Sequence, residues 1–550
     1  MTTGPDDKRK ISLVWMVSRE YDGLAGAGGV KDVCRQLAEA LVEHGGCAVR
    51  VIIPRYGFME PRSLGFKPLS LPGRQPVEPC PGSWHRTFDV DMNYVDENRR
   101  EAVSIWQNEI QGVTVFLAEA ERFAEKLGVY AYTAEEEKRH SWQRQGMGHY
   151  DYFAMNILLQ KSAIALMILL DERPDVIHCQ DGHAAVLPAM LREHEGYSHF
   201  FRHSGCVVTV HNAGIGYHQD VADLEFAAAV TGLPDRVIRA NTLNGSFDPF
   251  IAAADYAVLN TVSEQYAREL QETDEDVRTG GLGHGLLQRG VRLAGITNGI
   301  NPQDFDPTEP EKLGLPAAFD VAGGHLEGKR VCKETLIRSL NRVKKRARVV
   351  QHGSLAAKPE QPLFTFVGRL TLQKGVDLLV QSLESLLAED AGFQTLILGS
   401  GAPEFEARLI ELAGGDEFGG RICFLQGYDP DLALQVYAAG DFFLIPSLYE
   451  PCGLTDYIAQ LFGNLPIVHY VGGLVKVIDG TTGFAYQDHT PSALGETMWR
   501  AMALYRSSPA GIKTMQQAAV RRIYEHHTWE KVVGRYLELY EQARRMVCRY

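Results

Sequence analysis

The sequence predicts an α/β protein built on two doubly wound parallel sheets, one in each of two domains. Short runs of β-branched and apolar residues alternate with longer segments of helical spacing, which is typical of βαβ units. The same alternation starts again after residue 361. A chain of 550 residues is also longer than one hydrophobic core supports, so at least two domains are expected.

Five buried-strand runs are expected in the first domain, which we place at residues 10–305. They are 11–17, 48–54, 113–119, 175–180 and 206–212. Apolar residues with helical spacing follow the first run, from Val30 to Val42, and precede the fourth, from Tyr152 to Leu170. This order of strands and helices favours a parallel sheet.

A second set of strands defines the second domain, at residues 362–527. Its runs are 362–370, 393–401, 422–427, 441–447 and 465–470. Residues 306–361, between the two sets, are rich in Pro, Gly and charge, and we expect a linker there. The last segment, 528–550, is predicted to be a helix with one apolar face, formed by Val532, Val533, Tyr536, Leu539 and Tyr540. This face packs either on its own domain or back on the first.

Composition excludes several classes of function. The 55 Lys and Arg against 69 Asp and Glu give a net charge of −14, which argues against nucleic acid or an anionic membrane surface as the main partner. The nine cysteines form no C-x-x-C pair, so neither a zinc ribbon nor a disulfide framework is indicated. The longest apolar run, Ala163 to Leu170, is too short to span a membrane. We expect a soluble, cytoplasmic protein.

A glycine-rich loop follows the first predicted strand. Gly28 and Gly29 come directly before a predicted helix, whose N-terminus favours anions, and glycines let the backbone approach a ligand. The loop is not a dinucleotide-binding fingerprint, because Lys31 stands where its third glycine would be. A flexible loop without a ligand is the alternative.

Further candidates follow strands of the second domain. Arg369 and Lys374 lie on the loop after its first strand, where two cations suit a pyrophosphate. Glu450 follows the strand that ends at Ser447, and would be within reach of a sugar hydroxyl. Two glycine-containing turns are also expected to bind substrate: Gly453, Leu454 and Thr455, where a helix would open, and Gly472 with Gly473 after the next strand. All follow strand ends of one sheet, where α/β proteins bind ligands. Taken singly, the two cations are equally consistent with solvated surface residues.

A histidine-containing loop ends the fourth strand of the first domain. His178 and His183 lie close to Cys179 and Asp181, but no second ligand cluster has suitable spacing, so we expect no metal. His183 either has a structural role or faces the ligand.

Together these segments resemble bacterial glycogen synthases and plant starch synthases, which are retaining glycosyltransferases. The resemblance covers nearly the whole chain, through AGAGGVKDV, DVIHCQDGHAAVLPAM, TVSEQYAREL, GITNGINPQDFDP, GRLTLQKGVDLL, PSLYEPCGLTD and GGLVKVIDGTTGF. It implies a GT-B fold, in which two Rossmann-like domains face each other across a cleft. It also implies transfer of glucose from ADP-glucose to the non-reducing end of an α-1,4-glucan, without a metal or other cofactor.

The resemblance also implies roles for single residues. Arg369 and Lys374 would bind the donor phosphates, with donors from Gly453, Leu454 and Thr455. Glu450 would bind the donor glucose, and the backbone carbonyl of His183 would stabilise positive charge on the transferred sugar. Asn212 belongs to the family's His-Asn pair.

Four departures from the family pattern leave alternatives open. Gly26 stands where the family has a donor-contacting Lys, and Gly182 replaces the Trp of an Asp-Trp-His motif. The segment 213–220 differs from the aromatic-rich family version, and a basic residue is replaced near His469 and Tyr470. The alternatives are a glycosyltransferase with another nucleotide sugar or acceptor, or a weakly catalytic glucan-binding homologue.

Overall fold

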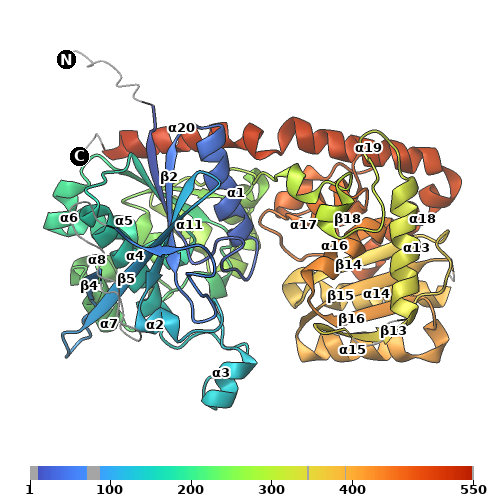
Figure 1. Ribbon diagram of the computed structural model, residues 1–550, viewed down its shortest axis with the longest axis horizontal. Helices are drawn as coiled ribbons and strands as arrows, with labels where there is room; N and C mark the ends of the chain where they lie inside the picture. The colour runs from blue at the N-terminus through green and yellow to red at the C-terminus, as the bar shows by residue number, and fades with distance from the viewer. Residues whose placement is uncertain (1–9, 71–86, 343–345, 390–391, 548–550) are drawn as a thin grey trace. The chain divides into compact units, whose positions relative to one another are not determined.

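Two largely parallel sheets carry the chain, one in each of two units (Figure 1). The computed structural model describes residues 10–70, 87–342, 346–389 and 392–547. The first unit consists of the described residues up to Gly299 and from Val532 onward. The second consists of those between Ile300 and Lys531.

The sheet of the first unit has the strand order β12-β11-β8-β7-β1-β2-β6-β5-β3, with β4 paired to β5. Its parallel strands are β1 (Leu13–Val17), β2 (Ala48–Pro54), β6 (Val113–Glu119), β7 (Val176–Gln180), β8 (Gly205–Val210), β11 (Val258–Thr261) and β12 (Ala294–Gly295). The antiparallel ones are β3 (Lys67–Pro68), β4 (Phe88–Asp91) and β5 (Arg100–Ile110). The five expected strands are therefore confirmed, and the antiparallel edge is an addition to them.

The order in which the chain adds strands to this sheet reverses between β1 and β7, although the two strands run parallel. From β1 the chain goes on to β2 at one side, and from β7 it goes on to β8 at the other. Such a switch point leaves a crevice at the carboxyl ends of the two strands. The loops after β1 and β7 are the ones that carry Gly28 and His183.

The sheet of the second unit has the order β13-β16-β15-β14-β17-β18-β19. Its parallel strands are β14 (Leu363–Leu370), β15 (Gln394–Gly401), β16 (Ile422–Gly427), β17 (Phe442–Ile445), β18 (Leu465–His469) and β19 (Phe484–Tyr486). The five strands expected here are confirmed as well. The switch point lies between β14 and β17.

Helices connect most of the parallel strands, as a doubly wound fold requires. The first unit contains α1 (Val30–Glu43), α2 (Glu121–Ala124), α3 (Ala134–Arg139), α4 (Tyr152–Leu169), α5 (Leu187–Glu193), α6 (Glu195–Phe200), α7 (Leu224–Thr231), α8 (Asp235–Ala240), α9 (Pro249–Ala253), α10 (Glu264–Glu272) and α11 (Leu282–Gln288). The second contains α12 (Pro310–Leu313), α13 (Glu327–Arg342), α14 (Val376–Glu389), α15 (Pro403–Gly414), α16 (Pro430–Ala439), α17 (Thr455–Leu461), α18 (Pro491–Ser507) and α19 (Pro509–His526).

The segment 306–361 is not the linker that its composition suggested. It contains α13 and also β13 (Val349–Gly353), which pairs antiparallel with β16 at the edge of the second sheet. The buried Lys329 of α13 donates hydrogen bonds to three backbone carbonyls. They belong to Ala438 in α16, Gly440 just before β17 and Phe462 just after α17. Charged residues concealed the apolar stripe of this helix, formed by Cys332, Leu336, Ile337 and Leu340. Residues 343–345 lie outside the described part.

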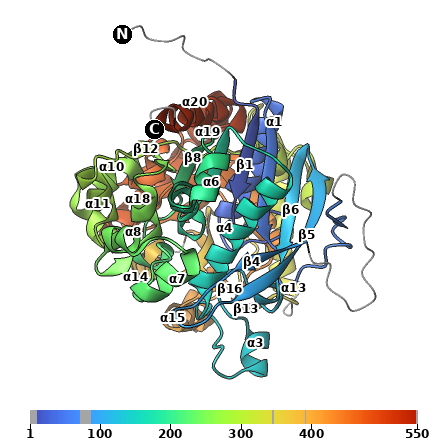
Figure 2. The ribbon, with the colours of Figure 1, turned by 90° about the vertical axis from the view of Figure 1, so that its left-hand side faces the viewer.

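The C-terminal helix α20 (Trp529–Val547) buries the face expected from its sequence. All five residues of that face are at most 5% exposed. The Tyr540 hydroxyl shares a hydrogen bond of 2.9 Å with Nδ1 of His178 in β7. From Val532 onward α20 therefore belongs to the first unit, and Figures 1 and 2 show it lying along that unit near α1. The sequence left open whether this helix packs on its own domain or on the first, and in the structure it packs on the first.

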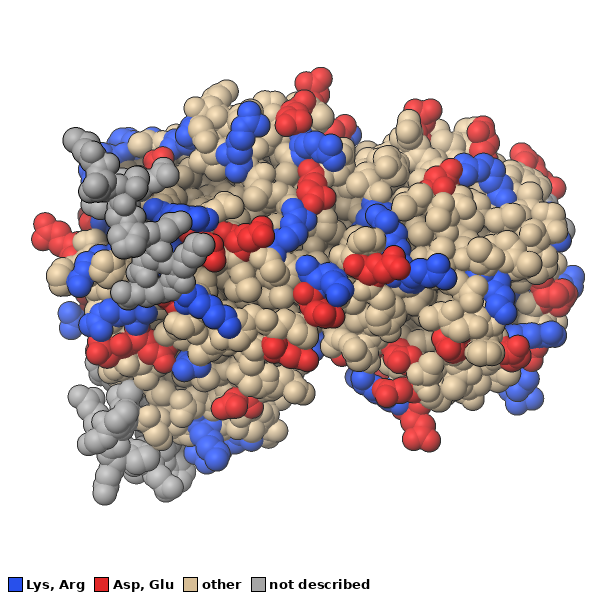
Figure 3. All heavy atoms as spheres, turned by 90° about the horizontal axis from the view of Figure 1, so that it is seen from above, with Lys and Arg blue, Asp and Glu red and all other residues tan. Residues whose placement is uncertain are grey.

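Among the described helices, α4 has the length and composition of a membrane span, but 72% of it is buried inside the fold, as in a core helix. The seven cysteines that the structure describes are buried and form no disulfide bond with one another, whereas Cys80 and Cys548 lie outside the described residues. On the face shown in Figure 3, basic and acidic side chains are interspersed. That face therefore carries no broad patch of one sign.

Candidate active site

In the second unit, Lys374 and Glu450 meet at the switch point of the sheet. Lys374 ends a 3₁₀ turn (Leu372–Lys374) directly after β14, and Glu450 lies on the loop after β17. The Lys374 Nζ and Glu450 Oε2 atoms are 2.5 Å apart. Ser447 Oγ donates a hydrogen bond of 2.9 Å to the same carboxylate oxygen. Two of the predicted site residues are thus brought together from positions 76 residues apart in the chain.

The environment of Glu450 keeps its carboxylate ionised. Burial raises the pKa of this carboxyl group. The Lys374 ammonium and the Ser447 hydroxyl together lower it by more than burial raises it, so the pKa lies below its ordinary value. The Glu450 side chain is 10% exposed. The loop therefore holds an ion pair with a buried carboxylate and a partly exposed ammonium group at the place where a ligand is expected.

The segment after Glu450 turns tightly into α17. Gly453 has a φ of +74°, a left-handed conformation that favours glycine, and after Leu454 the helix begins at Thr455, as predicted. The Gly473 amide donates to the Glu450 carbonyl, and a Cβ on Gly473 would lie 2.0 Å from a backbone oxygen of the same loop. The turn with Gly472 and Gly473 is therefore packed directly against the Glu450 loop.

Lys476, a buried lysine, holds this loop in place through hydrogen bonds. The sequence did not single it out. Lys476 Nζ donates to the carbonyl oxygens of Cys452 and Gly453, at 2.5 and 2.8 Å, and lies 3.0 Å from Asp456 Oδ1. Burial raises the pKa of Asp456 to about 6, although Lys476 opposes the shift. Its position three residues after a glycine pair is the only sequence signal that pointed to it.

Arg369 occupies the penultimate position of β14, on the same edge of the sheet as Lys374. Its side chain is exposed. The structure thus places both predicted cations at the carboxyl end of one strand.

In the first unit, His183 lies on a 3₁₀ turn (Gly182–Ala184) after β7. The Arg19 amide donates to its Nε2 at 3.0 Å, and the Gln160 side-chain amide donates to its carbonyl oxygen at 3.0 Å. Burial holds the pKa of the imidazole well below its ordinary value, with Arg19 adding to the effect. A neutral ring that accepts at Nε2 carries its proton on Nδ1. The His183 backbone and ring are therefore both held in place.

Arg19 itself is enclosed beside this turn. Its side chain is 1% exposed. Its guanidinium donates to the Tyr56 hydroxyl, to Asn156 Oδ1 and to the Val129 carbonyl, and lies 4.9 Å from the centre of the Tyr130 ring. Nothing in its spacing from the histidine marked it as part of the site.

The glycine loop binds a carboxylate of its own chain. Glu20 accepts hydrogen bonds from the amides of Ala27 and Gly28, at 2.7 and 3.2 Å, and from the Tyr130 hydroxyl at 2.7 Å. Gly29 precedes the first residue of α1 and places no side chain over the helix end. In this conformation the Gly28 amide is already bonded to the Glu20 carboxyl group.

Lys31 fills the space next to Gly26. A Cβ added to Gly26 would lie 2.3 Å from Lys31 Cδ. The Lys31 ammonium is 2.7 Å from a carboxylate oxygen of Asp22 and 2.7 Å from one of Asp32. The cation closest in sequence to the missing family Lys is therefore paired with two acidic groups.

Two other departures from the family pattern, Gly182 and the segment 213–220, lie in direct contact. A Cβ on Gly182 would lie 2.4 Å from the carbonyl oxygen of His218, so the segment 213–220 takes the space of any larger side chain. Asn212, the residue directly before this segment, accepts a hydrogen bond of 2.9 Å from the Gly214 amide. In the structure Asn212 shapes a turn.

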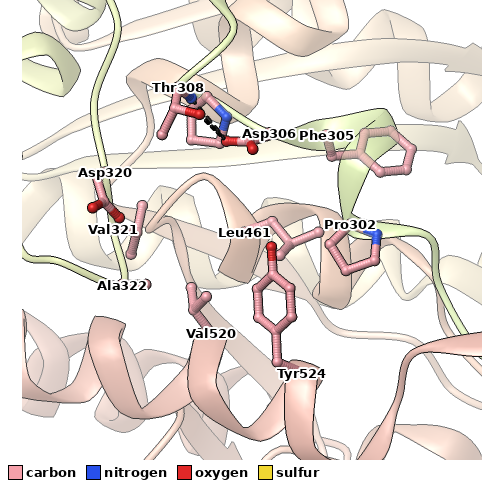
Figure 4. A pocket seen from close by; sticks show the side chains of 11 residues that line it. Pro302, Phe305, Asp306, Thr308, Asp320, Val321, Ala322, Leu461, Val520 and Tyr524 are labelled. Atoms are coloured by element: carbon pink, nitrogen blue, oxygen red, sulfur yellow. Dashed lines mark hydrogen bonds between the residues drawn. The ribbon is translucent and has the colours of Figure 1, made fainter. Parts of the chain in front are cut away.

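The described residues contain no cluster of three or more His, Cys, Asp or Glu side chains that could hold a metal ion. Figure 4 shows a small pocket within the second unit, between Phe305, Leu461, Val520 and Tyr524. Its volume of about 40 Å³ admits a few water molecules but not a sugar. The pocket is therefore not a candidate substrate site.

Comparisons with known proteins match both units. A family model described as the starch synthase catalytic domain matches residues 13–289, and one described as glycosyl transferases group 1 matches residues 348–513. Glycogen synthases from Aeromonas salmonicida and from an Anaeromyxobacter species are each 30% identical, covering 96% of this chain and 98% of theirs.

Solved structures share the fold. The catalytic domain of starch synthase IV from Arabidopsis thaliana, bound to ADP and acarbose, matches with a TM-score of 0.76 at 23% identity, over 98% of this chain and 100% of that one. A sucrose-phosphate synthase from Thermosynechococcus elongatus matches with a TM-score of 0.55 at 17% identity, over 96% and 98%. Both are two-domain α/β structures of the GT-B type, which is also the fold of this chain.

Proposed function

This chain belongs to the family of glycogen and starch synthases, and we propose on that basis that it transfers glucose from ADP-glucose to the non-reducing end of an α-1,4-glucan, with retention of configuration. The observation that carries the proposal is the ion pair between the partly exposed Lys374 and the buried Glu450 at the switch point of the second sheet. Family membership supplies the reaction, and this pair supplies groups with the charges that the reaction needs.

The second unit would stabilise the leaving group. Glycosyl transfer builds negative charge on the departing diphosphate and positive charge on the sugar. We assign Lys374 and Arg369 to the diphosphate, because both stand at the end of β14 and fixed cations lower the barrier when they are preorganised. The amides and hydroxyl around Thr455, where α17 begins, would add hydrogen-bond donors.

Glu450 would orient the donor sugar. Its carboxylate is ionised and accepts hydrogen bonds from Lys374 and Ser447 through the same oxygen, Oε2. A sugar hydroxyl could donate to the other oxygen without breaking the pair. Holding the sugar in this way would couple its position to the cation that binds the phosphates.

The first unit would contribute the His183 turn. We assign the backbone carbonyl of His183 to the positive charge that develops on the sugar. The Gln160 amide bonds this oxygen and fixes its direction. Because the imidazole is neutral, it adds no opposing charge there. The solved starch synthase with bound ADP and acarbose supports a nucleotide and a glucan as ligands of this fold.

A different nucleotide-sugar donor is the second candidate, and one observation favours it. Lys31, beside Gly26, is neutralised by Asp22 and Asp32, so the glycine loop offers the donor less positive charge than the family pattern does. We also propose a cytoplasmic location for the enzyme, which accords with the lack of disulfide bonds among the described cysteines.

A donor screen tests the proposal. The purified protein is given glycogen and either ADP-glucose or UDP-glucose, and release of nucleoside diphosphate is measured together with incorporation of glucose into the polymer. We expect ADP release that depends on glycogen and falls in Lys374→Ala. Release of UDP alone would favour the second candidate. Binding of glycogen without release of either diphosphate would leave a glucan-binding protein and refute the enzyme.

A further inference from the structure

A buried histidine connects the segment 213–220 to the start of α9. The side chains of His218 and Asp248 are 5% and 1% exposed. The His218 Nδ1 atom lies 2.6 Å from Asp248 Oδ2, and its Nε2 atom lies 2.8 Å from the Ala213 carbonyl oxygen. The ring also packs edge-on against Phe250, with 5.9 Å between ring centres. One side chain thus joins α9 to the beginning of the segment.

The two partners of this ring require it to be positively charged. Both are oxygen atoms that accept hydrogen bonds, and a neutral imidazole has a single N–H to donate. Only the doubly protonated ring makes both bonds. Burial lowers the pKa of His218, but the hydrogen bond and the charge of Asp248 raise it by more, and Asp220 adds to the rise. The pKa therefore lies above its ordinary value of 6.5.

The segment that His218 holds is strained where it meets the His183 turn. Gln219 has a φ of +63°. Asp181, directly before the turn, has a φ of +60° and a ψ of −177°, a conformation nearly confined to glycine. Their neighbours are in contact, since a Cβ on Gly182 would lie 2.4 Å from the His218 carbonyl oxygen. Strained backbone persists only where surrounding contacts hold it, and the His218 ion pair is such a contact.

The same segment bonds the residues that hold His183. Gln219 Oε1 accepts a hydrogen bond of 2.9 Å from the Asn156 amide, and Asn156 Oδ1 accepts one of 3.2 Å from Arg19. The backbone amide of Arg19 bonds the His183 ring. Gln160, one turn after Asn156 in α4, donates both to the Asn156 carbonyl and to the His183 carbonyl. A displacement of the segment would therefore move the groups that orient the His183 carbonyl.

We propose that His218 is a positioning residue for glycosyl transfer: its doubly protonated ring holds the segment 213–220 on α9 and thereby keeps the His183 carbonyl in place. The proposal rests on the proposed function, which assigns that carbonyl to the positive charge on the sugar. When Nε2 gives up its proton to water, the ring still donates from Nδ1 to Asp248. The Nε2 lone pair then faces the Ala213 carbonyl oxygen and repels it, which releases the beginning of the segment.

The dependence of kcat on pH tests this role. Because the folded-state pKa of His218 is raised, its contribution to stability is complete below the unfolded-state pKa of about 6.5 and is lost as the pH rises through the folded-state value. The kcat at saturating ADP-glucose and glycogen is measured from about pH 6 to about pH 9. We expect it to fall over this rise by roughly tenfold or more, since a small displacement of a catalytic group is costly.

The Asp248→Asn variant isolates the effect of the proton. The amide oxygen can still accept from the backbone amides of Phe250 and Ile251, as Asp248 Oδ1 does in the wild type, and the NH₂ group then faces His218. A neutral ring can accept from this group at Nδ1 and donate from Nε2 to Ala213, so both bonds are kept at alkaline pH. The variant should retain most of the wild-type kcat at pH 7 and lose the alkaline fall.

Two further variants separate positioning from other effects. His218→Phe removes both bonds and should lower kcat by roughly tenfold or more even at pH 6, with a much smaller change in the KM for ADP-glucose. His325→Gln is the control, because this exposed histidine of the second unit lies 4.0 Å from Asp320, and its loss should leave kcat and its pH dependence unchanged. Asp181, whose pKa burial raises to about 8, also titrates near the turn but is present in every variant.

Three outcomes would overturn the proposal: a wild-type kcat that is constant over this range, an equal alkaline fall in Asp248→Asn, or a wild-type kcat in His218→Phe. If His218→Phe does not fold, the pH profiles of the wild type and Asp248→Asn decide the question. The proposed function is judged separately, from ADP release by the wild type at pH 7. Urea unfolding over the same range tests the ion pair without any transfer, because only the wild type should lose stability as His218 is deprotonated.

Discussion

Replacing Lys374 with alanine tests the central ion pair through its dependence on pH. In the wild type the pKa of Glu450 lies below its ordinary value of 4.5, so the pair contributes stability above that pH and the contribution is lost as the pH falls through the folded-state pKa. Without Lys374, burial dominates and the pKa of Glu450 rises. The variant must then either bury an unpaired charge or take up a proton.

The unpaired carboxylate of the variant cannot lower the free energy of unfolding by more than the free energy needed to protonate it, because protonation removes the buried charge. Neutralising a carboxyl group of ordinary pKa 4.5 costs about 1.4 kcal/mol for each pH unit above that value. The limit is therefore about 3.4 kcal/mol at pH 7. At pH 5 it is below about 1 kcal/mol. The loss of stability should therefore shrink between pH 7 and pH 5, by up to about 2.7 kcal/mol.

Urea unfolding of the wild type and the variant at both pH values measures this difference, and kcat is expected to fall by about 100-fold or more. Glu450→Gln/Lys374→Ala is the matched control, because it has no carboxylate to titrate and should lose the pH dependence. A loss of stability that is the same at pH 5 and pH 7, or a kcat within tenfold of the wild type, would refute the assignment of Lys374.

Three further predictions concern the first unit. Gly182→Trp should lower the free energy of unfolding by about 1–3 kcal/mol or more, because its Cβ would lie 2.4 Å from a backbone oxygen. Gly196→Ala is the control: that glycine has open space around it, so the same urea titration should show no loss. Gly26→Lys combined with Lys31→Ala should lower the KM for ADP-glucose by roughly tenfold; an unchanged ratio of ADP-glucose to UDP-glucose activity would show that this position does not select the donor. Tyr540→Phe should cost about 1 kcal/mol through the lost hydrogen bond to β7, without a change in the urea m-value. A stability equal to the wild type would show that this bond does not hold the C-terminal helix.

Strands with continuous apolar runs were predicted from the sequence almost to the residue. β2, β6 and β16 begin and end where expected, because strands buried on both faces read as uninterrupted apolar stretches. β11 was missed, since its four residues include Asn260, whose buried side chain accepts a hydrogen bond from Thr209. β5 was missed because one of its faces is partly exposed and its composition is mixed. Whether such segments form strands depends on their tertiary contacts, which the local sequence pattern does not reveal.

The candidate site was predictable where a motif follows a strand, and not where a partner comes from elsewhere in the chain. Lys374 and Glu450 could be placed because the carboxyl ends of neighbouring strands share one edge. Gln160 could not, although a glutamine within the apolar helix α4 was a signal, since a buried polar side chain needs a partner. That partner is the His183 carbonyl, 23 residues further along the chain.

The departures from the family pattern are compensated in space by other residues of the same unit. Where the family has a Trp, Gly182 leaves room that the backbone of the segment 213–220 occupies. Where the family has a Lys, Gly26 leaves room that the Lys31 side chain occupies. A single substitution back to the family residue therefore meets a side chain or backbone already in place. It follows that Gly26→Lys alone measures a steric conflict as well as a charge, and that only the paired exchange with Lys31→Ala isolates the effect of a cation on donor choice.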